Sequence, residues 1–155
     1  LGADAMQASA AKKIYEAKGR PSDNPLIVHI ADVSALRNLT DEVPGKAVKL
    51  AKGFWPGPLT MLVKKSAAVP YETTGGMDTV AVRMPNHPIA LALIAASGTY
   101  IAAPSANTSG RPSPTTARPI TLPPENATES AAFIPEFMAA LVVRTFAFVA
   151  APIPR

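Results

Sequence analysis

The sequence contains no cysteine and only two histidines among its 155 residues. The absence of cysteine excludes disulfide bonds, zinc sites with thiolate ligands and thiol nucleophiles. Two histidines are too few for a metal site built from histidine alone, so we expect no resident metal. Apolar residues make up 48% of the chain and charged residues 17%. This composition is typical of a folded domain, and the chain is long enough to bury a core without crosslinks.

Long apolar runs and the common nucleotide-binding motifs are also missing. The apolar stretches 137–143 and 146–151 are separated by Arg144, and each is far shorter than the roughly 20 residues that cross a bilayer. We therefore expect no membrane anchor. No G-x-x-x-x-G-K-[ST] loop, G-x-G-x-x-G fingerprint or G-x-S-x-G elbow occurs. A nucleotide site in this chain must be built from other residues.

The formal net charge is +4, and the basic excess is unevenly distributed. Residues 1–117 hold 12 basic and 8 acidic side chains, whereas residues 118–155 hold three of each. Such a surplus fits a nucleotide or RNA phosphate partner, and it equally fits solvated lysines on helix faces. All glycines and lysines lie before residue 111. We expect one domain over residues 1–117 and a divergent tail rich in Ala and Pro, possessing little fixed structure, over residues 118–155.

Apolar runs and helix-ending residues predict alternating helices and strands. Gly19 and Gly98 each stand just past a stretch of good helix formers, where a left-handed residue commonly ends a helix. The segment 54–58 contains two prolines around a glycine and predicts a rigid turn, with Phe54 and Trp55 packed beneath it. We expect helices over 9–18, 32–39, 44–53 and 87–96, and strands over 26–30, 59–63, 79–84 and 100–103. This interleaving predicts an α/β fold with a mixed sheet.

Two cations follow the first predicted helix on a stiff loop, Lys18-Gly-Arg20-Pro-Ser-Asp-Asn24-Pro25. Arginine can fork two phosphate oxygens while lysine acts as a mobile point charge, so the pair suits a polyphosphate. The alternative is a helix C-terminus neutralised by basic residues, which is a common use of both.

A polar loop leaves the last predicted strand, reading Pro104-Ser105-Ala-Asn107-Thr-Ser-Gly-Arg-Pro-Ser113. Loops at strand ends are where the ligand crevice of an α/β sheet opens, and small polar groups there can hold phosphate or ribose oxygens. The same composition is typical of any surface turn.

Two ionisable residues lie inside predicted apolar strands. His29 stands in the segment 26–30, where a hydrogen-bonded core histidine is the simpler interpretation. Arg83 ends the run Val80-Ala-Val-Arg83. A buried charge is costly unless it meets an anion, so Arg83 is predicted to be functional.

Five motifs stand in a characteristic order: Lys18-x-Arg20, Asn24-Pro-Leu-Ile-Val-His29-Ile, Phe54-Trp-Pro-Gly-Pro-Leu-Thr60, Val80-Ala-Val-Arg83-Met-Pro and Pro104-Ser-Ala-Asn107-Thr-Ser-Gly110. From residue 1 to about residue 117 the chain resembles the YrdC/Sua5 family of threonylcarbamoyl-AMP synthases. The resemblance implies a YrdC/RibB-like fold, a twisted mixed sheet flanked by helices with a concave basic site.

The resemblance also implies an activity. Members join L-threonine, bicarbonate or CO2, and ATP into threonylcarbamoyl-AMP and pyrophosphate, with Mg²⁺ shielding the leaving group. The product serves the N6-threonylcarbamoyladenosine modification of tRNA, through a downstream tRNA threonylcarbamoyl transferase. A cytoplasmic location is implied, with mitochondrial or plastid locations open, and the basic surface is a candidate for binding tRNA or double-stranded RNA.

Residue roles follow from the matched motifs. Lys18 and Arg20 match the basic pair that holds ATP phosphates and supports catalysis. The positions implied to contact the nucleotide are Asn24, Thr79, Ser105, Asn107 and Ser113. Those implied to contact threonine are His29, Arg83 and Ala103, the last through its backbone.

The chain departs from the family at both ends. It begins without Met, and the segment Pro-Thr-Glu-Thr-Val-Tyr-Gly that family members carry before this point is missing, as is a later Ser-Thr-Val-Val-Asp strand. We therefore expect a truncated domain with weakened stability and turnover. Two other functions stay open. One is the carbamoyl-adenylate module of hydrogenase maturation, although no Cys-rich finger is present. The other is an RNA-binding module without catalysis, although 6% aromatic residues offer few stacking partners.

Overall fold

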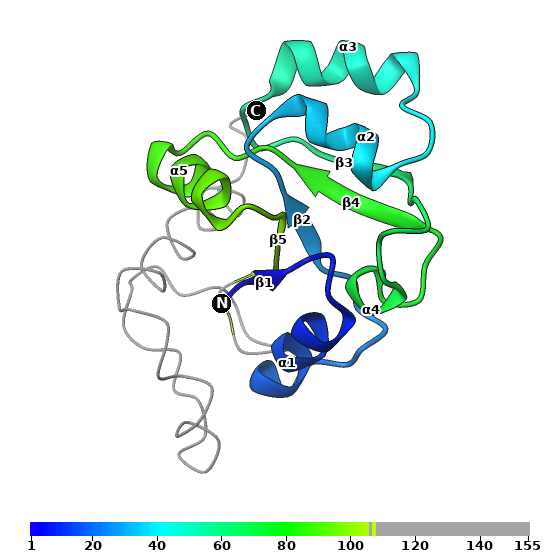
Figure 1. Cartoon of the computed structure of the whole chain (residues 1–155), viewed down its shortest axis with the longest axis vertical. Coiled ribbons are helices and arrows are strands. Elements are labelled where there is room, and N and C mark those ends of the chain that lie inside the picture. The colour runs from blue at the N-terminus through cyan, green and yellow to red at the C-terminus, as the bar shows by residue number, and fades with distance from the viewer. Residues whose placement is uncertain (106, 108–155) are drawn as a thin grey trace, which may run out of the picture.

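A computed structural model describes residues 1–105 and 107 of the chain. Helices and strands alternate along the described part and form a single sheet with helices packed against it (Figure 1). The elements in chain order are β1 (Ala3–Asp4), α1 (Ala8–Lys18), β2 (Ile27–His29), the 3-10 turn η1 (Val33–Ala35), α2 (Leu36–Leu39), α3 (Gly45–Phe54), β3 (Thr60–Lys64), α4 (Tyr71–Thr74), β4 (Thr79–Arg83), α5 (Pro88–Ser97) and β5 (Ile101–Ala103).

The sheet is mixed. Its strand order is β1-β5-β2-β4-β3, in which β2 and β4 run parallel and every other neighbouring pair runs antiparallel. Both β2 and β4 therefore lie inside the sheet, with a partner on each side. This arrangement confirms the α/β class and the mixed sheet predicted from the sequence.

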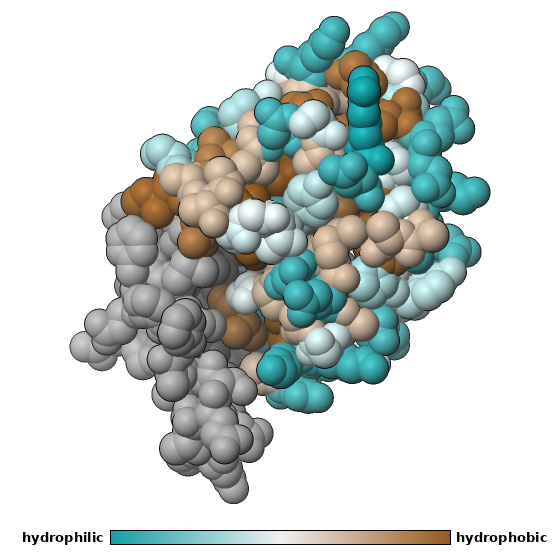
Figure 2. All heavy atoms as spheres, viewed as in Figure 1, coloured by the Kyte–Doolittle hydropathy of each residue, from teal (hydrophilic) through white to brown (hydrophobic). Residues whose placement is uncertain are grey.

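Side chains of one face of the sheet form the hydrophobic core. Because successive strand residues point to opposite faces, Val28, Val80, Val82 and Ala102 share a face, and all four are buried. They cluster with apolar side chains from the helices α1, α2 and α3. Figure 2 shows hydrophilic side chains gathered over α3 and the segment between α2 and α3. The helical layer thus separates this core from solvent.

The opposite face carries a different set of side chains. The alternation places Thr79, Ala81 and Arg83 of β4 on this face, together with His29 of β2. On the edge strand β3 the same face presents Leu62, which is 68% exposed. The two ionisable strand residues therefore lie on the face that the hydrophobic core does not use, beside Leu62, Ile27 and Ile101.

Glycine ends two helices as predicted. Gly19 has φ +54 after α1, and its N–H donates to the carbonyl of Glu16. Gly98 has φ +66 after α5. The left-handed conformation turns the chain sharply, and only glycine adopts it at little cost.

Two elements, β1 and α4, were not predicted from the sequence. Both depend on distant parts of the chain: β1 pairs with β5, and the Thr73 hydroxyl of α4 donates to the carbonyl of Ala5 at 2.7 Å. The Tyr15 hydroxyl of α1 donates to the carbonyl of Glu72 at 3.0 Å. Elements of two and four residues carry little periodicity of their own, so such contacts decide their existence.

The prediction for Phe54 was wrong and that for Trp55 is confirmed. Trp55 is buried and its indole N–H donates to the carbonyl of Leu59 at 2.7 Å, whereas Phe54 is 59% exposed. The inward side of α3 repeats every four residues through Ala47, Ala51 and then Trp55. Phe54 falls outside that repeat.

Within residues 1–105 and 107, no helix has both the length and the apolar character needed to cross a membrane.

A glycine substitution tests how the loop that carries Asn24 is held. Gly75 has φ +61, and a Cβ there would lie 2.7 Å from the carbonyl oxygen of Asp23. Gly75→Ala should lower the free energy of unfolding by more than the roughly 1–2 kcal/mol that the left-handed conformation costs. The control is Gly98→Ala, which has φ +66 and open space around the added Cβ. Urea denaturation measures both, and equal destabilisation would contradict the steric contact.

Candidate functional site

One row across the sheet brings together the two ionisable strand residues. His29 of β2 is paired with Arg83 of β4 on one side and with Ile101 of β5 on the other. Arg83 is in turn paired with Thr60 of β3. Paired residues project from the same face, so His29, Arg83 and Thr60 form a polar row at the carboxyl end of β2 and β4.

Arg83 is a buried cation. Its residue is only 4% exposed, and its Nε donates to the carbonyl of Gly57 at 3.2 Å. No acidic side chain among residues 1–105 and 107 forms an ion pair with it. Burial lowers the pKa of Arg83, yet a guanidinium keeps its proton in proteins. The charge is therefore held in a desolvated place with a single carbonyl as its partner in the described part of the chain.

His29 is neutral at physiological pH. It is also 4% exposed, and its Nδ1 lies 3.3 Å from the carbonyl of Ile101. A carbonyl only accepts, so this contact assigns the proton of the neutral ring to Nδ1. Burial, and then the charge of Arg83, lower the pKa of His29 to about 4. Two residues that the sequence predicted separately thus form one electrostatic unit.

A second row lies at the amino end of the same strands. Continuing the register by two residues from Ile27, which pairs with both Ala81 and Ala103, brings Pro25 level with Thr79 and Ser105. The Arg20 Nη2 donates to the carbonyl of Pro25 at 3.1 Å. Arg20 therefore lies just before the amino end of β2.

The loop after α1 folds back onto itself and onto the segment after β5. Arg20 Nε donates to the carbonyl of Asn24 at 3.3 Å, and its Nη2 also donates to the Asn24 side-chain oxygen. Lys18 Nζ donates to the carbonyl of Ser105, and the Ser105 hydroxyl donates to the side-chain oxygen of Asn107. Residues from two distant loops thus form one cluster.

Lys18 is held near a like charge. It is 8% exposed, and burial, followed by the charge of Arg20, lowers its pKa to about 8. At pH 7 the ammonium is still mostly protonated, although the protein gives it no negative partner among the described residues. Two cations in this state favour a polyanion such as a polyphosphate.

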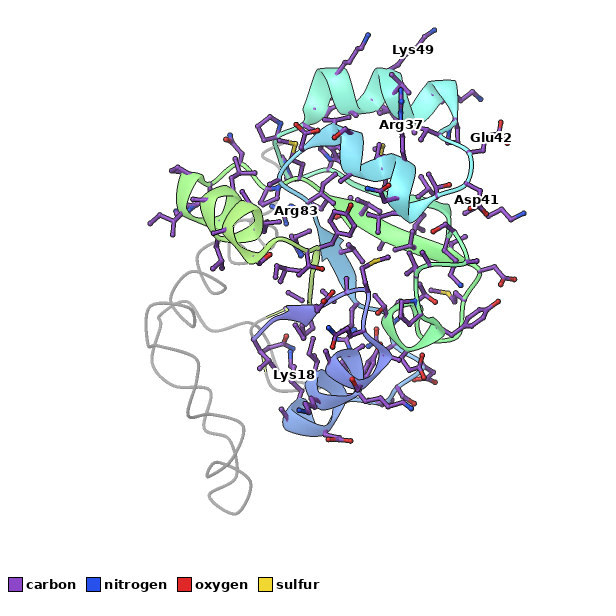
Figure 3. The ribbon with its side chains drawn as sticks, viewed as in Figure 1. Lys18, Arg37, Asp41, Glu42, Lys49 and Arg83 are labelled. Atoms are coloured by element: carbon purple, nitrogen blue, oxygen red, sulfur yellow. The ribbon has the colours of Figure 1, made fainter. Side chains whose placement is uncertain are left out.

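The two rows are separated by a row in which Ile27 lies between the small side chains of Ala81 and Ala103. Thr79 and Arg83 are four residues apart on one strand, which corresponds to about 13 Å at roughly 3.3 Å per residue. Between them lie Ala81 and Ala103, paired through Ile27. Figure 3 shows Lys18 and Arg83 toward opposite ends of β2. The face thus offers cationic groups at two separate places.

The structure places most of the predicted site residues and adds two. Ser113 lies outside the described residues. The Gly57 carbonyl and the small side chain of Ala81 were not singled out from the sequence, although both lie within motifs that it did identify. The described residues hold no group of three His, Cys, Asp or Glu side chains able to bind a metal ion.

An α/β sheet face with paired cations at one end and a buried arginine at the other is typical of proteins with an anion-binding site. Residues 1–127 match the model of the Sua5/YciO/YrdC family, which is described as "Telomere recombination". The chain belongs to that family, and the resemblance seen in its motifs is confirmed.

Several relatives have a named activity or a solved structure. The chain is 62% identical over 117 residues to the threonylcarbamoyl-AMP synthase of Pyrococcus abyssi and 63% identical over 118 residues to that of Bacillus subtilis. Each match covers 76% of this chain and 34% of the relative. The crystal structure of P. abyssi Sua5 complexed with L-threonine matches with a TM-score of 0.73 at 62% identity, covering 76% of this chain and 34% of that one.

A more distant structure shares the fold alone. Full-length HypF in the phosphate- and nucleotide-bound form matches with a TM-score of 0.65 at 22% identity, covering 76% of this chain and 18% of that chain. With respect to the curated synthases of P. abyssi and B. subtilis, the chain spans about a third of their length.

The pH dependence of stability tests the buried state of His29. Because its pKa is lowered to about 4 from the usual value near 6.5, the unfolded chain binds the proton more tightly. Its contribution is complete above pH 6.5 and is lost as the pH falls toward 4, by up to about 3 kcal/mol. His29→Gln should flatten this part of the profile, measured by urea denaturation from pH 4 to 7.

The matched control is His87→Gln, which removes the chain's other histidine and should keep the loss on the acid side because His29 is retained. An unchanged acid slope in His29→Gln would show that another group causes it.

Proposed function

We propose that this chain forms the ATP and threonine site of a threonylcarbamoyl-AMP synthase. The observation that carries the proposal is the two-ended sheet face: the cluster of Lys18 and Arg20 lies at the amino end of β2, and the buried Arg83 lies at the carboxyl end of β4. The synthases of P. abyssi and B. subtilis, at 62% and 63% identity, support the same activity.

The carboxyl end of β2 and β4 is proposed to take L-threonine. Arg83 lacks an acidic partner among the described residues, and the carboxylate of an amino acid would compensate its charge with two parallel hydrogen bonds. Neutral His29 beside it adds no second charge, so the pocket suits one carboxylate. The backbone at Ala103, one row away, would contact the amino acid. The threonine bound in P. abyssi Sua5 supports this assignment.

The amino end is proposed to take ATP. Lys18 and Arg20 would hold the phosphate oxygens, and the neighbouring polar groups would fix the nucleotide. Ligand phosphates would supply the negative partner that Lys18 lacks and would raise its lowered pKa again. The groups assigned to the nucleotide beside the two cations are Asn24, Thr79, Ser105, Asn107 and Ser113.

The proposed reaction joins the two ends. The threonine amine adds to CO2 and loses a proton, which gives a carbamate. A carbamate oxygen then attacks the α-phosphorus of ATP, and the bond to the pyrophosphate leaving group breaks. Negative charge collects on the phosphate oxygens in the transition state, where Lys18 and Arg20 are placed to stabilise it. Holding the two substrates on one sheet face would bring the reacting groups together, so positioning would supply much of the rate.

Mg²⁺ is proposed to arrive as the counterion of the ATP phosphates. The residues assigned to the nucleotide are cationic or neutral, and the described residues hold no cluster of three metal-ligating side chains. Such a donor set does not fit a resident Mg²⁺ site, because Mg²⁺ prefers carboxylate and phosphate oxygens.

The product of the proposed reaction would pass to a tRNA threonylcarbamoyl transferase, which would use it to modify adenosine in tRNA.

The direct test supplies the chain with ATP, bicarbonate and radiolabelled L-threonine. We expect pyrophosphate release that depends on threonine, together with a labelled threonylcarbamoyl-adenylate. Serine in place of threonine, and omission of bicarbonate, are the controls. Binding of RNA without any pyrophosphate release would favour the non-catalytic RNA-binding module instead.

Substitutions at the two ends should separate the two substrates. Arg20→Ala should weaken ATP binding about 10- to 100-fold, as loss of a charge-assisted contact of roughly 1–3 kcal/mol implies. Arg83→Ala should weaken threonine binding by a similar factor and leave ATP binding nearly unchanged. Calorimetric titration with each substrate measures both effects.

The control for these variants is Arg37→Ala. Arg37 is an exposed arginine on α2, in the helical layer, and Figure 3 shows it apart from both Lys18 and Arg83. It should bind both substrates normally. A loss of ATP affinity in Arg83→Ala with normal threonine affinity would reverse the assignment of the two ends.

A further inference from the structure

The turn between α3 and β3 contacts the buried arginine. Arg83 Nε donates to the carbonyl of Gly57 at 3.2 Å, and the N–H of Gly57 donates to the carbonyl of Met84 at 2.8 Å. The turn and the end of β4 are thus joined by two hydrogen bonds, one of which ends on the guanidinium. The carbonyl of Gly57 therefore restricts rotation of the long Arg83 side chain.

The turn itself is held rigidly in place. The N–H of Trp55 donates to the carbonyl of Ala51 at 3.0 Å, and its indole N–H donates to the carbonyl of Leu59 at 2.7 Å. Gly57 has no room for a side chain, because a Cβ there would lie 2.3 Å from the carbonyl oxygen of Phe54. Glycine is therefore required at this position by close backbone approach rather than by a positive φ.

The contact selects which edge of the guanidinium faces a ligand. A guanidinium can grip a carboxylate with Nε and one terminal nitrogen, or end-on with both terminal nitrogens. With Nε engaged by Gly57, the end-on edge with Nη1 and Nη2 is the remaining bidentate edge. The carbonyl also holds Arg83 in one orientation before the ligand arrives, which reduces the ordering that binding must supply.

We propose that Gly57 is a positioning residue for substrate recognition: its carbonyl orients Arg83 so that the carboxylate of the amino acid is bound end-on by the two terminal nitrogens. This role rests on the proposed function, because it presupposes an amino-acid substrate at Arg83. It assigns the Pro-Gly-Pro turn to threonine affinity and not to the nucleotide, whose cluster lies at the other end of the strands.

The test compares two alanine substitutions in neighbouring glycines. Gly57→Ala introduces the clash with Phe54 and displaces the carbonyl. Gly53→Ala, four residues earlier in α3, adds a Cβ with nothing within 4 Å. We expect Gly57→Ala to weaken threonine binding by about 10- to 100-fold, the range for a charge-assisted contact. ATP affinity should stay within about twofold, because the substitution removes no contact to the phosphates. Loss of an ionic contact to ATP would lower its affinity by more than that. Gly53→Ala should bind both substrates normally.

An analogue without the carboxylate separates positioning from general damage. L-threoninol carries a hydroxymethyl group in place of the carboxylate, so Arg83 has nothing to grip. Wild type should bind it far more weakly than threonine, and Gly57→Ala should bind it as weakly as wild type does. Trp55→Phe, which removes the hydrogen bond to Leu59 and keeps an aromatic ring in the core, should show the same pattern in milder form.

Each outcome decides the matter. An equal loss for threonine and threoninol, or a parallel loss of ATP binding, would show that the turn has only a structural role. Normal threonine binding by Gly57→Ala would overturn the positioning role while leaving the proposed function intact. Failure of wild type to bind threonine at all would overturn both.

Discussion

The burial of one positive charge organises this fold. Arg83 projects from an interior strand and is 4% exposed, with the Gly57 carbonyl as its hydrogen-bond partner. A desolvated charge without a counterion costs several kcal/mol. The neighbouring His29 stays neutral because its own burial lowers its pKa and the charge of Arg83 lowers it further. Under the proposed function, the carboxylate of the amino acid would supply the negative charge that the described residues do not provide.

The same principle operates at the other end of the strands. Lys18 and Arg20 stand close enough for the charge of Arg20 to lower the pKa of Lys18, on top of the larger effect of burial. Without a ligand, the protein thus keeps two positive charges close to each other in a partly desolvated place. Whatever binds the folded form alone also stabilises it, so ligand affinity and folding stability are coupled through these cations. Under the proposed function, ATP and threonine would each stabilise the folded protein through the cation that it contacts.

Local sequence signals were sufficient to predict most helices and strands. They were insufficient to predict which distant residues those elements contact. Gly19 and Gly98 ended helices where expected because a left-handed residue is a local requirement. The charge of Arg83 within an apolar strand indicated function, since its cost does not depend on knowing the neighbours. The strand β1 and the helix α4 were missed because contacts with distant residues create them. The support from Gly57 was missed as well, because a backbone carbonyl has no side-chain signature.

Register is the step between the hydrophobic pattern and the chemistry. The alternation of Val80 and Val82 with Ala81 and Arg83 places apolar side chains on the core face and the site on the other. A slip by one residue would turn every side chain to the opposite face and bury Arg83 in the core. A slip by two would keep the faces but pair His29 with Ala81, which would separate the histidine from the arginine. The core therefore determines the site: the valines that stabilise the sheet also fix which ionisable residues meet.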